Sequence, residues 1–212
     1  GWTAVSGGSL TGAGGYGVTL GADTGNTNVF AYYKVAEGNE TGSLRVRLTT
    51  INVAWSQMYR ITNATQDWSV AGSTGSDTTA GNVSITMSAN PGVTAGDLIL
   101  GAMVIPTDVT TPAQFSAENF TQTGVVFGAR TEISEPDSTL GNDLGGFAVR
   151  ALVTSGTGSA APVMTATAGG TTTNVRGPGI FIRVRATGAI TYQSAGALNY
   201  IGATLATSVC PA

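Results

Sequence analysis

The sequence predicts an all-β protein, an antiparallel β-sandwich of jelly-roll-like form with little or no helix. Its 212 residues include 33 Thr and 31 Gly. Thr is a strand former and Gly supplies the corners between strands. Only 10% of the residues are charged, against about a quarter in an average domain. No stretch has the apolar stripe of an amphipathic helix.

Ten runs of strand composition, each closed by Gly, Asn, Asp, Ser or Pro, are expected to be strands. They are residues 28–35, 43–50, 55–62, 66–71, 82–88, 97–105, 124–131, 146–154, 162–168 and 179–186. With the two terminal segments they make about a dozen strands, at the spacing of a sandwich or barrel. Residues 73–77 and 155–161 are expected to be turns, because they are rich in Gly and Ser.

The alternation of side chains predicts which strands are half-exposed. In residues 44–48, Arg45 and Arg47 alternate with apolar residues, and Arg183 and Arg185 repeat the pattern. A solvent-facing row of arginines with cross-strand salt bridges is the favoured interpretation, and an interface with a partner is the alternative. Residues 97–105 are nearly all apolar, which predicts a central strand covered on both faces.

The composition predicts one sandwich domain over residues 1–187 and a tail over residues 188–212. Residues 1–22 and 186–212 contain no charged side chain. Uncharged ends of this kind are expected to be docked. Residues 1–22 would form a strand or arm, and the tail an edge strand of the same domain or an arm exchanged with a neighbouring subunit, with disorder as the remaining alternative. The candidate interface residues in the tail are Tyr192, Leu198, Tyr200, Ile201 and Leu205.

Charge and missing residue types exclude several functions. A net charge of −3 and a pI of about 4.7 argue against a nucleic-acid partner, which would need a basic patch. No run of 18 apolar residues is present, so no membrane partner is expected. The chain has no His, which removes Ser-His-Asp and Cys-His triads and His-ligated zinc. No nucleotide-binding motif surrounds Lys34, and Cys210 has no second Cys to pair with. We therefore expect no catalytic residue, no cofactor and no metal, and no enzyme activity.

Carboxylates offer the remaining routes to chemistry. Glycoside hydrolysis needs only two carboxyl groups across a groove, and the candidate pairs are Glu37 with Glu40 and Glu132 with Glu135. Both pairs lie in turn-like segments, where solvated carboxylates are the favoured interpretation. Calcium would need oxygen ligands from loops. Asp137, Asn142 and Asp143 offer such ligands, although turn chemistry explains them equally well.

Aromatic residues are concentrated between Phe30 and Trp68. Tyr33, Trp55 and Trp68 are the candidate glycan-stacking residues, because exposed rings on a sandwich face stack on sugars. Core packing is the favoured alternative for them. Alternation places Phe30 and Tyr32 on one face and Tyr33 on the other, so only part of the group can be exposed together.

Four segments together carry a resemblance to a protein family. They are residues 33–40, residues 91–105, a Thr-Pro segment with aromatics at 111–120, and the closing strand 178–185. From about residue 28 onward this order resembles the β-sandwich, jelly-roll-like structural proteins of tailed bacteriophages. The resemblance implies a role on the virion surface as a capsid decoration, head-fibre or tail-fibre protein, and it transfers no catalytic residue.

The function predicted from the sequence is that of a virion structural protein, a capsid decoration or cement protein, located on the extracellular virion. Its partners would be other virion subunits, including further copies of the same chain, and it would act by burying surface against them. The alternative is a glycan- or receptor-binding fibre domain, with a surface glycan as its partner. A glycosidase is the third hypothesis.

Overall fold

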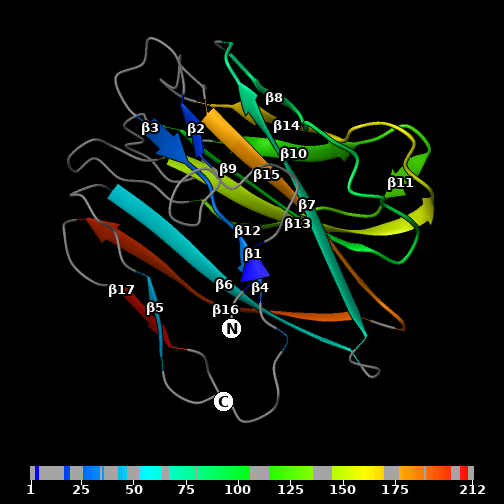
Figure 1. Ribbon diagram of the computed structural model, residues 1–212. Coiled ribbons are helices and arrows are strands. Elements are labelled where there is room, and N and C mark those ends of the chain that lie inside the picture. The colour runs from blue at the N-terminus through cyan, green and yellow to red at the C-terminus, as the bar shows by residue number, and fades with distance from the viewer. Residues whose placement is uncertain are drawn as a thin grey trace.

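The computed structural model is all-β (Figure 1). It describes residues 3–4, 17–19, 26–33, 35, 43–46, 53–63, 67–79, 81–105, 115–135, 145–169, 177–188, 190–201 and 206–209. None of these residues belongs to a helix, so this part of the chain contains no helix that could cross a membrane. The predicted fold class is confirmed: antiparallel sheets pack together as in a β-sandwich.

Seventeen strands are described along the chain. In order they are β1 (Thr3–Ala4), β2 (Gly17–Thr19), β3 (Asn26–Asn28), β4 (Tyr32–Tyr33), β5 (Ser43–Val46), β6 (Val53–Asn63), β7 (Trp68–Asp77), β8 (Val83–Thr86), β9 (Leu98–Ile105), β10 (Phe115–Thr121), β11 (Val125–Phe127), β12 (Thr131–Ser134), β13 (Gly145–Gly156), β14 (Val163–Ala168), β15 (Gly177–Ala186), β16 (Ile190–Ile201) and β17 (Ala206–Val209).

A six-stranded sheet forms the centre of the molecule. Its order is β11-β13-β9-β15-β7, and β12 also pairs with β13. Every pairing in it is antiparallel. β9 lies between β13 and β15, and seven of its eight residues are buried. The prediction of a central strand covered on both faces is confirmed.

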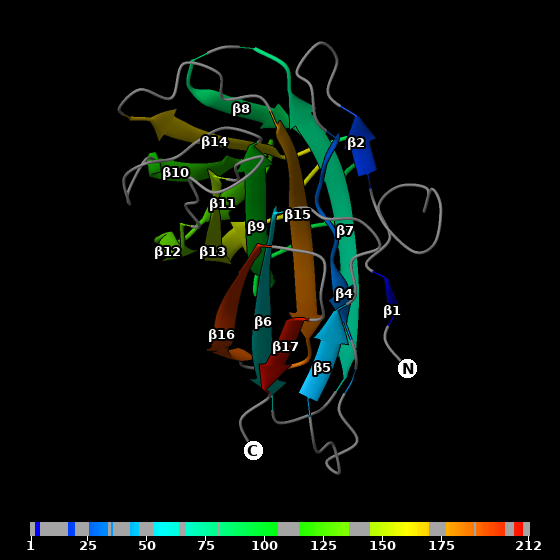
Figure 2. The same ribbon diagram turned by 90° about the vertical axis from the view of Figure 1, so that its left-hand side faces the viewer.

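Two further layers cover the faces of this sheet (Figures 1 and 2). The three-stranded sheet β10-β14-β8 packs on one face over the main core, in which Phe120 meets Phe181 edge to face at 5.3 Å. On the other face, side chains of β6 and β16 pack over Leu98, Leu100 and Val184. Side chains that alternate along β9 therefore enter two different cores.

The terminal strands pair within the chain. β16 pairs with β6 from Ile190↔Asn63 to Ile201↔Val53. β17 pairs with β5, and β1 pairs with β4. Residues 190–201 and 206–209 of the tail are therefore strands paired within the chain.

Two predictions about β7 and β15 are wrong. Residues 73–77 are not a turn but the second half of β7, paired with β15 from Phe181 to Gly177. Small residues are needed there for packing, because a Cβ on Gly75 would meet the Thr86 carbonyl and the Ile85 side chain. Arg183 does not face solvent. It is buried, because its face of β15 is the one that the β8 layer and the connection from β8 to β9 cover.

Two strand boundaries also differ from the prediction. β10 was not predicted as a strand, since FSAENFT lacks a clear apolar alternation. Its register shifts between Ser116 and Asn119, and Ala117 in that bulge has a φ of 54°. The predicted strand 124–131 is two strands, β11 and β12, which pair with different parts of β13.

Candidate functional site

Four of the five candidate interface residues lie on β16. Tyr192, Leu198, Tyr200 and Ile201 are opposite Ile61, Ser56, Ala54 and Val53 of β6. Leu205 lies outside the described residues. We call these two long strands, β6 and β16, the β6–β16 ribbon (Figure 1).

The end of the ribbon that begins at the Ile190↔Asn63 pair packs on the core. The Tyr192 ring lies 5.5 Å from that of Tyr59, and the Arg150 guanidinium stacks 4.6 Å above the Tyr192 ring centroid. Burial, and next the neighbouring Tyr192, raise the pKa of the Tyr59 hydroxyl. The Ser134 hydroxyl donates to the Gln57 side-chain oxygen and so ties β6 to β12. This end of the ribbon is therefore part of the folded unit.

The ribbon carries little charge and has open edges. Arg60 is the only charged residue in its two strands. Among the described residues the two strands form a sheet of their own, in which each has one partner. Edge strands without charged or proline residues are templates for pairing with another chain. β16, which has 12 residues and no charge, is thus the longest uncharged edge that the described residues offer.

The three candidate glycan-stacking residues do not form one platform. Trp55 packs against the cluster of Val29, Val104 and Ile180, and Trp68 packs against the separate cluster beneath the ribbon. Tyr33 is half-buried on β4, opposite Thr3 of β1. Among these residues, the packing matches the core interpretation for the two tryptophans.

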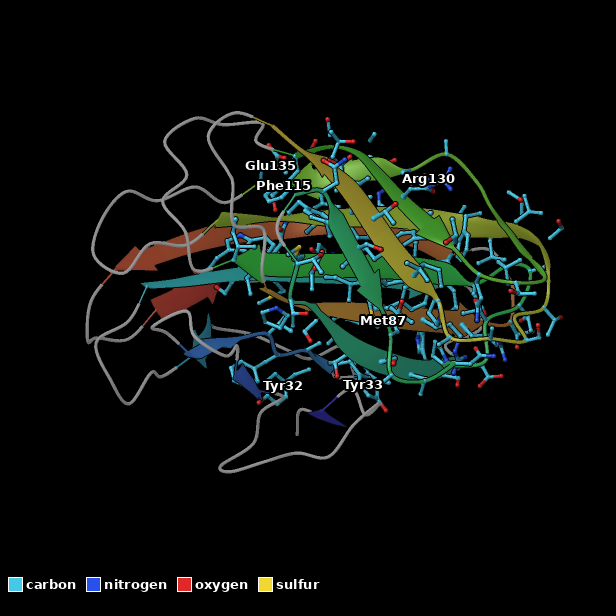
Figure 3. The ribbon with its side chains drawn as sticks, turned by 90° about the horizontal axis from the view of Figure 1, so that it is seen from above. Tyr32, Tyr33, Met87, Phe115, Arg130 and Glu135 are labelled. Atoms are coloured by element: carbon cyan, nitrogen blue, oxygen red, sulfur yellow. The ribbon has the colours of Figure 1, made fainter. Side chains whose placement is uncertain are left out.

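Exposed aromatic side chains instead lie at the neighbouring positions. Phe30 is 49% exposed, Tyr32 48% and Val35 45%. Figure 3 places Tyr32 and Tyr33 on the opposite side of the molecule from Glu135 and Phe115. The alternation of side chains places Phe30 and Tyr32 on one face, so the sequence itself indicates that these two side chains can be exposed together.

The structure brings Glu132 and Glu135 together and adds Glu118. One oxygen from each of the three carboxylates lies within 4.8 Å of the others, between the edges formed by β10 and β12. Glu135 also accepts a hydrogen bond of 2.8 Å from the Phe115 amide. Burial, and next the charge of Glu118, raise the pKa of the Glu132 carboxyl. Sequence reasoning missed Glu118 because it comes from another sheet.

This cluster by itself assigns no chemistry. Three close carboxylates suit a hard cation and two suit a glycosidase, but exposed acidic groups are common without either role. The other predicted carboxylates and amides lie outside the described residues; they are Glu37, Glu40, Asp137, Asn142 and Asp143.

The paired arginines of β15 have different surroundings. Arg185 makes a salt bridge, but with a buried carboxylate outside the strands: its Nε lies 2.7 Å from Oδ1 of Asp97, which precedes β9. Arg183 is only 6% exposed and has no such partner among the described residues. The side chains of Arg45 and Arg47 lie outside the described part.

Comparison of the chain with protein-family models, with curated proteins and with solved structures finds no match.

Proposed function

We propose that this chain is a structural protein that acts by burying surface against neighbouring subunits, with the β6–β16 ribbon as its attachment edge. The observation that carries the proposal is the ribbon itself. It has strands of 11 and 12 residues, a single charge at Arg60, and one partner for each strand among the described residues.

Strand addition is the physical basis of this attachment. An extended segment that pairs with a ribbon edge gains main-chain hydrogen bonds along its length, and side chains on alternate positions add specificity. A stable interface buries about 800 Å² per partner. Strands of this length offer an edge of about 35–40 Å, which suits an interface of that size.

The proposed setting is the virion surface, as a capsid decoration or cement protein. The resemblance to structural proteins of tailed bacteriophages supports this setting. So do the low charge and the absence of His from the sequence, which suit a shell component better than an enzyme. On a repeating lattice, many weak contacts of this kind would add up through multivalency.

The test is an added charge at the far end of the ribbon. We expect the parent protein to be an oligomer by light scattering and Ile201→Asp to reduce its mass to that of a monomer. Thr191→Asp is the matched control, since Thr191 is an exposed residue at the anchored end of the same strand. A thermal melt of each variant checks that the fold is kept. A monomeric parent, or an Ile201→Asp variant with the parent's mass, would contradict the proposed attachment edge.

A second candidate function is glycan binding by a fibre domain. The half-exposed Phe30 and Tyr32 favour it, because exposed rings stack on sugar faces. Glycan-array binding that is lost in Tyr32→Ala and kept in Val126→Ala, an exposed apolar residue of β11, would support this function. Absence of binding in the parent protein would refute it.

A further inference from the structure

Arg183 is a buried cation that has few acceptors within the protein. Within the described part of the chain, its Nη1 and Nη2 donate to the Ser69 hydroxyl alone, at 3.3 and 3.2 Å, and its buried Nε has no hydrogen-bond partner. A guanidinium has five N–H donors, whereas a hydroxyl oxygen has two lone pairs. At least three N–H groups of Arg183 therefore have no acceptor among the described residues.

The nearby carboxylate is already committed to the other arginine. Asp97 receives bonds of 2.7 and 2.8 Å from Nε and Nη2 of Arg185, and a third of 2.7 Å from the Thr94 amide. Asp97 thus pairs with Arg185, and it acts on Arg183 through its charge without a hydrogen bond among the described residues. Burial, and next the charge of Arg185, lower the pKa of Arg183, while Asp97 acts in the opposite direction. This corner of the sandwich carries an excess positive charge.

A buried cation without an anion is costly in free energy, because desolvation is not offset by pairing. The chain has only nine basic residues, and one of them, Arg183, is buried at this corner. The described partner of Arg183 lies at the surface, however. Ser69 is an exposed residue on β7, the outermost strand of the central sheet in the described part of the chain. The terminal nitrogens of Arg183 therefore lie within hydrogen-bond distance of a hydroxyl at the surface.

We propose that Arg183 and Ser69, with Arg185 beside them, form a binding site for an oxyanion. The Ser69 oxygen occupies the edge of the guanidinium formed by Nη1 and Nη2. Two oxygens of a carboxylate or phosphate group would therefore accept from the other edge, formed by the unpaired Nε and the Nη beside it, a fork geometry that guanidinium groups favour. The Ser69 oxygen accepts from Arg183, so its own proton is available to the anion. The oxyanion is either free in solution or the carboxylate side chain of a bound neighbour.

The experiment compares thermal unfolding of the full chain in chloride with unfolding in phosphate and in acetate, at matched ionic strength. We expect a saturable rise in Tm of about 3–6 °C at a tenfold excess over Kd. Arg183→Met should remove the saturable part, because Met keeps the length of the side chain without its charge. Arg130→Met, at an exposed guanidinium that donates to the Phe120 carbonyl, should keep it.

Two further measurements distinguish the source of the anion and guard against misfolding. The Nε–H resonance of Arg183 in the parent protein should shift on addition of phosphate, which needs no variant. If the anion comes from a neighbouring subunit instead, Arg183→Met should lower the mass of the oligomer and phosphate should compete with assembly. A parent protein with no saturable rise in Tm, no resonance shift and an Arg183-independent mass would overturn the proposal.

Discussion

Asp97 is a buried anion on which one end of the sandwich depends. It is 1% exposed and accepts hydrogen bonds from Arg185 on β15 and from the Thr94 amide. Arg185 Nη2 also donates to the Gly92 carbonyl and the Thr94 hydroxyl. One ion pair thus holds the connection from β8 to β9 against β15.

Replacing Asp97 should therefore destabilise the protein strongly. Asp97→Ala is expected to lower the free energy of unfolding by about 3 kcal/mol, since it removes charged hydrogen bonds and leaves Arg185 unpaired. Asp67→Ala is the control, because Asp67 is exposed and accepts a single hydrogen bond from the described residues, that of the Thr187 hydroxyl. Urea denaturation measures both variants. Equal losses in the two would show that the buried ion pair has no special weight.

Glu132 gives the protein a pH dependence of predictable sign. Burial and the neighbouring Glu118 raise its pKa in the folded state. The folded state then binds this proton more tightly than the unfolded state, so ionisation of Glu132 lowers stability as the pH rises through the folded pKa. Below the ordinary Glu pKa of about 4.3 the effect is absent.

Glu132→Gln should accordingly raise Tm at pH 7 and leave it unchanged near pH 3. Melting curves across this pH range, recorded beside those of Asp67→Asn as an exposed control, give the comparison. A lower Tm for Glu132→Gln at pH 7 would mean that the ionised carboxylate stabilises the fold.

Among the elements, β9 depends on a glycine at its centre. A Cβ on Gly101 would lie 2.6 Å from Cε1 and 2.8 Å from Cζ of Phe120, whose ring comes from β10 in the covering layer. The missing side chain makes room for the ring, which packs edge to face on Phe181 at 5.3 Å. The two layers could not approach as closely with any larger residue at this position.

Gly101→Ala should overpack the core and cost about 1–3 kcal/mol of unfolding free energy. The same substitution in a Phe120→Leu background should cost much less, because the smaller side chain vacates the contact, and the two changes will not be additive. Chemical denaturation of the single and double variants measures this coupling. Strict additivity would rule out the contact as the cause.

The strands that the sequence predicts well are those with clear apolar patterns. The continuous apolar run of β9 is typical of a buried strand, and the alternation of apolar and polar residues in β8 and β14 is typical of half-buried strands. β10 and the second half of β7 escape prediction because tertiary packing, not local pattern, holds their polar and small residues extended. For the sites, alternation groups Arg183 with Arg185 on one face. It cannot tell that this face is covered by a connection elsewhere in the chain.

At the scale of the whole molecule, the C-terminal tail covers one side of the core. Ile190 and Tyr192 pack over the cluster of Leu98, Leu100 and Val184. Ile190 and Tyr192 are themselves partly buried, and each fully buried apolar side chain that they help to cover contributes about 1.5–3 kcal/mol. An uncharged tail that covers such a cluster stabilises the fold of its own chain, and attachment to a neighbour would be a second role.

Removal of residues 190–212 should therefore uncover this apolar face and abolish the cooperative thermal transition. We expect strong binding of a hydrophobic dye and low soluble yield from the truncated chain. Removal of residues 206–212 alone is the comparison, since it leaves β16 paired. A truncated chain without residues 190–212 that keeps the parent's Tm would mean that the ribbon adds nothing to the core.

The pairing of β6 with β16 also sets the order in which the chain can fold as it is made. Residues 53–63 meet their partner only after some 130 further residues have been made, which takes about 7 to 26 seconds at common elongation rates. Until then β6 and the β9 side chains beneath it are exposed to other nascent chains. Neighbouring chains translated from one message could then exchange their C-terminal strands before either is complete. Slower synthesis would lengthen that interval. Growth at a lower temperature, which slows synthesis, should therefore raise the fraction of strand-exchanged dimers.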